Sequence, residues 1–175
     1  MSSKPEILDH AVAVLRRGES LTLDAVAREA GLTKPGVVHH FPTKEKLVVA
    51  VMDHITDRWE ADLIAQAPEA TTPVEKLRSY VEYALTGDFD HSDLTFMVDP
   101  RIRDQLAERW VTRLNPWFGD TLEGTAGQRA SLRAARLLAD GAWLNTALNI
   151  TAVREDENTL VRQIAQRLIT EGTTS

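Results

Sequence analysis

The 175-residue sequence predicts an all-α fold, and two features of its apolar pattern, a helical period and the lack of alternation, indicate this class. Apolar residues recur every three to four positions through most of the chain, which is the period of an amphipathic helix. A strict alternation of apolar and polar residues, which would indicate strands, occurs in no segment. All four tryptophans lie in the second part, residues 51–175, so the aromatic content is concentrated away from residues 1–50.

The first 41 residues predict three helices in a compact arrangement. Residues 7–17 form an amphipathic helix, and the pattern from Thr22 to Phe41 predicts two short helices joined by a tight turn at Gly31. Thr22 can cap the first short helix and Thr33 the second, because a hydroxyl accepts a hydrogen bond from an unpaired first-turn N–H. This is a helix-turn-helix, whose second helix can lie in the DNA major groove.

The second short helix is expected to leave a face for DNA. Val37 and Phe41 lie four residues apart and can tie the helix to the core, so Lys34 is left facing outward. Lys34 can reach a phosphate or a guanine edge, and Lys44 can hold a second phosphate. The candidate DNA contacts are Thr22, Thr33, Lys34, Pro35, Gly36, Val38, His39, His40 and Lys44. An ordinary three-helix core is the alternative, but the coincidence of these features favours DNA binding.

The chain resembles the tetracycline-repressor (TetR) family of bacterial transcription factors. The matching residues are Thr22-Leu23, Val26-Ala27, Ala30-Gly31-Leu32-Thr33-Lys34, His39-His40-Phe41-Pro42-Thr43-Lys44-Glu45 and Leu47. The resemblance implies an all-helical homodimer with a three-helix DNA-binding head over residues 1–50. It also implies a helical effector-binding and dimerisation domain over residues 51–175, and repression that a small ligand relieves.

Three departures from the family pattern predict a weak grip on non-specific DNA. Val38 stands where the family usually has a tyrosine, and Pro35-Gly36 replaces a turn that often carries a hydroxyl. The N-terminal arm holds only Lys4. The charge distribution agrees with this prediction. The whole chain has a net charge of −6, but residues 1–50 carry seven Lys/Arg and six Asp/Glu, a net charge of +1. A weakly basic head implies few phosphate contacts and a shallow dependence of affinity on salt.

The second part of the chain predicts a series of longer helices. Residues 43–67 form one long helix that leaves the head and can act as a lever between ligand and DNA. Further helices are expected over residues 73–87, 100–118 (interrupted at Pro116), 128–150 and 158–170, with irregular structure over 88–99 and a loop over 119–127. The last two helices carry many apolar and small residues, which favours a homodimer through a four-helix interface over a purely intramolecular core.

Aromatic residues of the second part suggest a pocket for a small apolar or aromatic effector. The candidate ligand-binding residues are Trp59, Tyr83, Phe96, Met97, Trp110, Arg113, Trp117, Trp143 and Asn145. For any single ring, a simple core role is the better interpretation, and it is the rings taken together that favour a pocket.

Composition excludes several other classes. The chain has no cysteine, so disulfides and thiolate metal sites are excluded, and a reducing cytoplasm fits. No segment is apolar enough to be a signal peptide or to span a membrane. Asp88, Asp90, His91 and Asp93 could bind a metal, but a solvated loop is the better interpretation. No catalytic motif stands out, so we expect neither an enzyme nor a cofactor.

The sequence therefore predicts a ligand-responsive repressor that binds a near-palindromic operator as a homodimer. Two alternatives remain open. One is an activator or a regulator without a ligand, and the other is an interaction module with a degenerate DNA-binding head.

Overall fold

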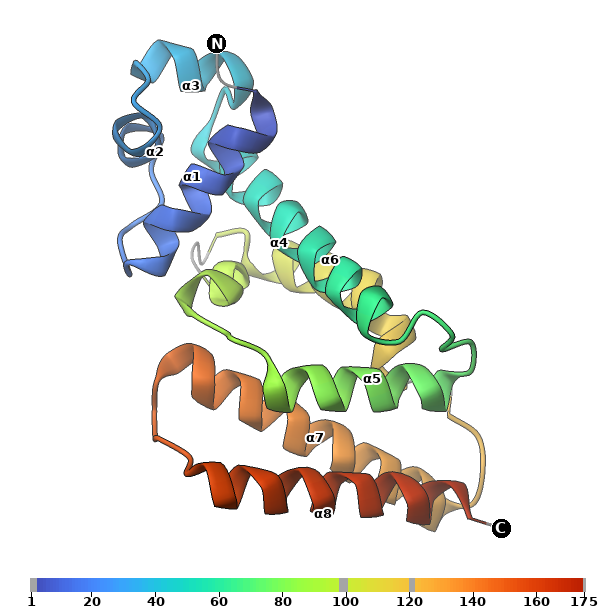
Figure 1. The fold of residues 1–175 in the computed structure, drawn as a ribbon. Coiled ribbons are helices and arrows are strands. Elements are labelled where there is room, and N and C mark those ends of the chain that lie inside the picture. The colour runs from blue at the N-terminus through green and yellow to red at the C-terminus, as the bar shows by residue number, and fades with distance from the viewer. Residues whose placement is uncertain (1–2, 98–100, 120–121, 175) are drawn as a thin grey trace. The chain divides into compact units, whose positions relative to one another are not determined.

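The computed structural model describes residues 3–97, 101–119 and 122–174, and this part of the chain is helical throughout its regular elements (Figure 1). The elements are α1 (Lys4–Arg16), α2 (Leu23–Glu29), α3 (Lys34–His40), α4 (Lys44–Gln66), α5 (Pro73–Thr86), η1 (His91–Met97), α6 (Arg103–Phe118), α7 (Ala126–Leu148) and α8 (Glu155–Thr173). The predicted all-α class is confirmed.

The chain forms two compact units, which α4 and α6 both enter. Unit 1 consists of Met1–Arg58 and Asp90–Thr112, and unit 2 consists of Trp59–Phe89 and Arg113–Ser175. The core of unit 1 lies among α1, α2, α3 and the first part of α4. It is built from side chains that are at most 5% exposed, namely Ile7, Ala11, Val14, Leu15, Val26, Val37, Phe41, Leu47, Val51 and Ile55. The apolar period of each helix supplies these positions, as an amphipathic pattern requires.

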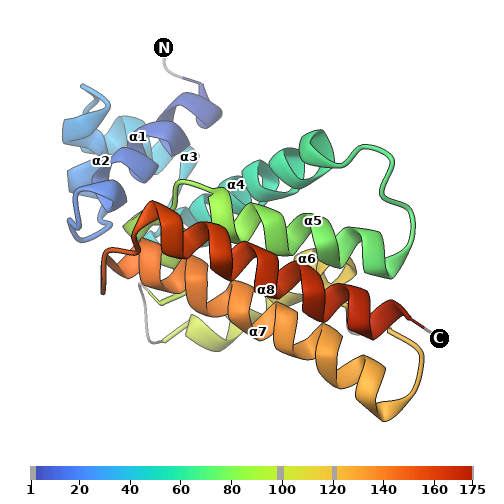
Figure 2. The same ribbon diagram turned by 60° about the horizontal axis from the view of Figure 1, so that its bottom comes forward.

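Unit 2 contains three long helices that lie side by side, α5, α7 and α8 (Figures 1 and 2). The chain reverses between α7 and α8 at Asn149, which ends α7 in the left-handed conformation. The two helices approach closely where Gly172 faces Leu132. A Cβ added to Gly172 would lie 2.4 Å from the Leu132 Cγ, so only glycine permits this approach.

Three helices begin before their predicted starts, and capping boxes account for two of them. Ser3 and Glu6 form a capping box, so α1 begins at Lys4 instead of residue 7. Thr125 and Gln128 form another, so α7 begins at Ala126 instead of residue 128. The last helix begins at Glu155, three residues before the predicted start.

Two predictions about irregular structure were wrong. Residues 88–99 were expected to be irregular, yet His91–Met97 form the 3₁₀ helix η1. The Asp93 carboxylate accepts a hydrogen bond from the Asp90 N–H at 2.9 Å and so stabilises this turn. Pro116 does not interrupt α6, which continues to Phe118. Because the helix ends two residues later, the missing N–H removes a bond only from its last turn.

Candidate nucleic-acid interface and effector pocket

Two threonine caps position the helix-turn-helix. The Thr22 hydroxyl accepts a hydrogen bond from the Ala25 N–H at 3.0 Å, and the Thr33 hydroxyl accepts one from the Gly36 N–H at 3.3 Å. Both predicted caps are therefore confirmed. Gly31 adopts a φ of +64° at the turn between α2 and α3, a conformation that glycine reaches without strain. These local bonds fix where each helix starts, and hence which residues of α3 face outward.

The outer face of α3 collects most of the candidate DNA contacts. Val37 is buried, while the side chains of Lys34, Pro35 and His39 are exposed. Gly36, Val38 and His40 lie half-buried between them, and the ring centroids of His39 and His40 are 5.3 Å apart. Of the remaining candidates, Thr22 and Thr33 are the residues before α2 and α3, and Lys44 is the first residue of α4.

An ion pair joins the two helices of this motif. The Lys34 Nζ lies 2.9 Å from the Asp24 Oδ2, and both side chains are more than half exposed. Sequence reasoning did not select Asp24, and it missed this contact with Lys34. The ten-residue separation carries no simple helical signal, because the turn between α2 and α3 sets the distance.

The arginines of the head are also paired with carboxylates. Arg17 contacts Glu29 at 2.6 Å and Glu19 at 2.8 Å, and Arg28 contacts Glu19 at 3.1 Å. The hydrogen bonds that Arg17 donates to Glu29 and then to Glu19 raise the pKa of Arg17 further above its ordinary value. Arg16 contacts Asp90 at 2.9 Å within unit 1. The carboxylates of the head therefore largely cancel the positive potential that its arginines would present to DNA phosphates.

Three of the candidate ligand-binding residues come together in unit 2. Trp59, Tyr83 and Trp143 form an aromatic cluster with Phe89, which sequence reasoning did not select. Ring centroids of Trp59 lie 5.2 Å from Tyr83, 5.1 Å from Phe89 and 5.5 Å from Trp143. Trp59 is fully buried, and Phe89 and Trp143 are each 5% exposed. The rings therefore pack against one another and fill the space between α4, α5 and α7.

The other candidates do not join this cluster. Trp110 and Met97 belong to unit 1, where Met97 is exposed. Trp117 lies under the Lys76 ammonium, 5.8 Å from its ring centroid, and Arg113 forms an ion pair with Glu60. The side chain of Phe96 lies outside the described part of the structure. The structure thus distributes the predicted set over several environments.

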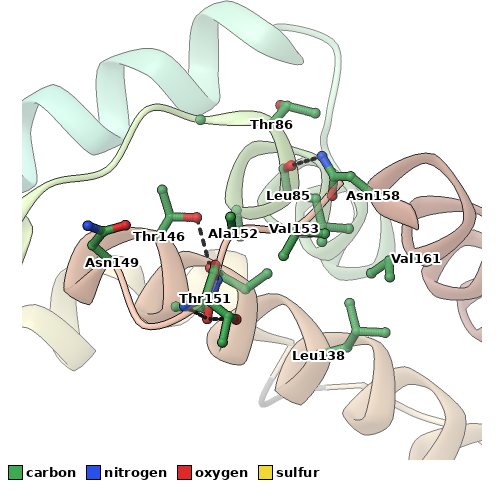
Figure 3. A pocket seen from close by; sticks show the side chains of 14 residues that line it. Leu85, Thr86, Leu138, Thr146, Asn149, Thr151, Ala152, Val153, Asn158 and Val161 are labelled. Carbon is green, nitrogen blue, oxygen red and sulfur yellow. Dashed lines mark hydrogen bonds between the residues drawn. The ribbon is translucent and has the colours of Figure 1, made fainter. Parts of the chain in front are cut away.

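A pocket of about 550 Å³ lies within unit 2 and contains one predicted residue, Asn145. Its volume falls in the range of small-molecule sites, about 300–1,000 Å³. Figure 3 shows side chains of α5, α7, α8 and the α7–α8 connection around it. The described residues that line it are Ala84, Leu85, Thr86, Gly87, Leu138, Ala142, Asn145, Thr146, Asn149, Thr151, Ala152, Val153, Asn158 and Val161. All of these are aliphatic, glycine or uncharged polar residues.

Asparagine side chains shape this pocket. The Asn145 amide donates to the Thr151 carbonyl at 2.8 Å and accepts from the Thr151 N–H at 3.2 Å, which fixes the α7–α8 connection. The Asn158 amide donates to the Leu85 carbonyl at 3.4 Å, as the dashed line in Figure 3 shows. Sequence reasoning expected aromatic walls, whereas an aliphatic and amide surface lines the pocket.

The described residues offer neither a metal-binding cluster nor a membrane-spanning helix. Among residues 3–97, 101–119 and 122–174, no three His, Asp or Glu side chains are grouped so as to hold a metal ion. Asp90 and Asp93, which the sequence offered as ligands, pair with Arg16 and Arg58. No helix in the same ranges has the length and apolar character needed to cross a membrane.

An all-α chain whose N-terminal helices form a helix-turn-helix with an outward recognition face belongs to the class of helix-turn-helix DNA-binding regulators. The sequence profile described as "Bacterial regulatory proteins, tetR family" matches residues 7–51. The HTH-type transcriptional regulator BetI of Brucella melitensis is 32% identical over 160 residues, which cover 84% of this chain and 81% of that protein. The chain belongs to the TetR family of bacterial transcriptional regulators. It is accordingly a regulator of transcription and not an enzyme.

Further similarities agree with this family. The regulator RutR of Escherichia coli K12 is 30% identical over 91 residues, 48% of this chain and 42% of that protein. Among solved structures, the multidrug binding protein EbrR complexed with ethidium superimposes with a TM-score of 0.61 at 20% identity, covering 96% of this chain and 99% of that chain. A TetR-family member from Streptomyces coelicolor A3 gives 0.59 at 22% identity, covering 95% and 98%. These structures share the fold.

Proposed function

We propose that this regulator is a ligand-responsive repressor that binds a near-palindromic operator as a homodimer and is released by a small effector. In this proposal residues 1–50 bind double-stranded DNA, and residues 51–175 bind the effector and form the dimer. The single observation that carries the proposal is the outward face of α3, where Lys34, Pro35 and His39 are exposed beside a capped helix start. N–H groups at a helix start and a lysine suit phosphates and base edges.

Exposed apolar side chains on the last two helices support the proposed dimer. Leu137 on α7 is 61% exposed, and Leu160 and Ile164 on α8 are 58% and 41% exposed. Leu160 and Ile164 lie four residues apart, so they share one face of α8. An isologous pairing would bury the same helices of both protomers and would place two recognition helices at successive half-sites.

The pocket of unit 2 supports an effector that is small, uncharged and largely apolar. Its lining supplies aliphatic surface from Leu85, Leu138 and Val161, and it supplies amides from Asn145 and Asn158. Burying a charge against such a lining would be costly, since no described lining residue carries an opposite charge. EbrR, a protein of the same fold, has been solved in complexes with ethidium and with malachite green, so this fold can bind small aromatic compounds. Both dyes are cations, so they support a small-molecule ligand for the fold, whereas the uncharged character proposed here rests on the pocket lining alone.

The proposed release acts through the helices that the pocket shares with the rest of the chain. Helix α5 contributes Ala84 and Leu85 to the pocket, and α7 contributes Ala142 next to Trp143 of the aromatic cluster. Helix α4 contributes Trp59 to that cluster and runs back without a break to Lys44. An effector that shifts α5 or α7 would therefore move α4 and change the spacing of the two heads, at a coupling of about 1–3 kcal/mol.

The test is a mobility shift of the purified protein on the DNA flanking its own gene, at two salt concentrations. We expect a specific and salt-sensitive shift, and a dimer by sedimentation equilibrium. Lys34→Ala should lower DNA affinity by about five-fold at 0.15 M salt, the contribution of one phosphate-type contact per protomer. Lys76→Ala on α5 removes the same charge from unit 2 and is the matched control.

Each part of the proposal has its own contrary outcome. Equal affinity of Lys34→Ala and wild type would refute the DNA-binding face, and a monomer in sedimentation would refute the proposed dimer. Effector binding is followed by tryptophan fluorescence, since Trp59 and Trp143 lie in the cluster beside the pocket helices. A panel of uncharged compounds that leaves both fluorescence and DNA affinity unchanged would favour a regulator without a ligand.

A further inference from the structure

We propose that Asp24 is a positioning and specificity-determining residue. It holds the Lys34 ammonium in place for its DNA contact and cancels the charge of that ammonium toward non-specific phosphates. This inference rests on the proposed function, because it concerns the same face of α3. It adds a residue that no motif of the sequence pointed to.

The geometry places the pair at the junction of the two helices. Asp24 lies in the first turn of α2, and Lys34 is the first residue of α3. The Nζ–Oδ2 distance of 2.9 Å is that of a charge-assisted hydrogen bond. Because a lysine ammonium has three donors, one bond to Asp24 leaves two donors for DNA. Asp24 thereby restricts a long side chain that would otherwise sample many rotamers.

Stability of the fold does not account for this pair. The side chains are 55% and 65% exposed, and an ion pair in such a position contributes little to the free energy of folding. Its effect on DNA is different in kind. Non-specific binding follows the number of phosphates neutralised, whereas specificity depends on how well a donor is aimed at a base edge. A carboxylate bonded to the Lys34 ammonium therefore lowers non-specific binding and improves the alignment of this donor with a base edge.

The charge pattern of the head agrees with such a role. Arg16, Arg17 and Arg28 all pair with carboxylates, so the Asp24–Lys34 pair extends to α3 an arrangement that the arginines of the head share. A regulator must find its site among many competing non-specific sites, so the ratio of the two affinities matters more than either alone.

The experiment compares wild type with Asp24→Asn on two duplexes of equal length. One carries the site that the wild-type protein selects from a random pool, and the other has a scrambled sequence. We expect Asp24→Asn to raise affinity for the scrambled duplex by about five-fold for each bound protomer at 0.15 M salt, and to steepen the slope of log K against log salt by about 0.9 for each bound protomer. Affinity for the selected site should stay equal or fall, so the ratio of the two affinities falls at least five-fold.

Two further variants separate charge from structure. Asp24→Glu keeps the carboxylate and should retain the wild-type salt slope. Asp9→Asn is the matched control, because Asp9 is a similarly exposed acid of the same unit that contacts His54 instead of Lys34. It removes one negative charge and should leave the slope and the ratio of affinities unchanged. Circular dichroism melts at one protein concentration confirm that each variant is folded.

The outcomes are distinct. An unchanged scrambled-duplex affinity and salt slope in Asp24→Asn, with wild type binding DNA, would overturn this inference alone. An equal loss on both duplexes with an unchanged slope would assign Asp24 only to the stability of α2, and would also overturn it. If wild type binds neither duplex at low salt, the proposed function fails and this inference fails with it.

Discussion

The two tyrosines of the chain both lie on α5, and both donate a hydrogen bond to an aspartate, but their surroundings differ. The Tyr80 hydroxyl lies 2.5 Å from the Asp140 Oδ1 on α7, and Tyr80 is 1% exposed. The Tyr83 hydroxyl lies 2.9 Å from the Asp62 Oδ2 in a solvent-exposed hydrogen bond, although the Tyr83 side chain as a whole is half-buried. Replacing each tyrosine with phenylalanine removes one oxygen, so the pair isolates the effect of burial on one kind of bond.

We expect Tyr80→Phe to lower the free energy of unfolding by about 2 kcal/mol. Hydrogen bonds to a charged partner contribute about 1.5–3 kcal/mol, and a buried acceptor that loses its donor adds a desolvation penalty. Asp140 keeps Arg136 at 3.3 Å and is 28% exposed, so part of its charge remains compensated. At about 2–4 °C per kcal/mol for a chain of this size, the melting temperature should fall by about 4–8 °C.

The assay is urea unfolding at a fixed protein concentration, with melting curves in parallel. Tyr83→Phe is the control, because it keeps the ring contacts with Trp59 and Phe89 and removes only a solvent-exposed hydrogen bond. It should stay within about 0.5 kcal/mol of wild type, as changes confined to the surface usually do. A change in the unfolding midpoint without a change in slope shows that stability itself has changed. If both variants lose the same stability, or if Tyr80→Phe matches wild type, the reasoning from burial is refuted.

The same contact predicts a pH dependence. Burial and then the Asp140 charge raise the pKa of Tyr80 well above its ordinary value of 10.0. A raised pKa means that the folded state favours the neutral phenol, so this contribution to stability is fully present below pH 10 and is lost as the pH rises above it. Wild type should therefore lose stability more steeply than Tyr80→Phe above pH 10. Parallel curves would contradict this prediction.

Two further predictions concern the helices of unit 2. Gly172→Ala should destabilise by about 1–3 kcal/mol, because its Cβ would lie 2.4 Å from the Leu132 Cγ. Gly141→Ala is the control, because nothing in the structure lies within 4 Å of the new Cβ in α7, and it should stabilise the protein by about 0.5–1 kcal/mol. Melting curves of both variants give the sign of each change. A stabilised Gly172→Ala would contradict the packing argument. Hydrogen bonds from the backbone of Thr72 and then Thr71 lower the pKa of Glu75 to about 2, so its support of α5 is present above its ordinary pKa of 4.5 and lost as the pH falls toward 2. Acid titration of wild type against Glu75→Gln, followed by circular dichroism, should show this loss only in wild type.

Local signals in the sequence were sufficient for the helix-turn-helix. Thr22, Gly31 and Thr33 act within three or four residues of their own position, through caps and a left-handed turn. Such contacts need no distant partner, and the structure confirms both caps. The same kind of signal at Ser3 and Glu6 was present but overlooked, so the start of α1 was placed too late.

Contacts between distant residues decided the rest. Asp90, the residue before η1, accepts a hydrogen bond from Arg16, which lies 74 residues away in sequence. No local sequence pattern predicts this bond. The sequence left both a pocket role and a core role open for each tryptophan, and it did not predict that Trp59 would meet Trp143 while Trp110 belongs to the other unit. The sequence by itself determined the long helices, the two threonine caps and which side chains of α3 face outward, because caps and apolar period act locally. Only the tertiary structure decided that an aliphatic and amide surface lines the pocket and that Lys34 pairs with Asp24, since those contacts depend on how helices pack.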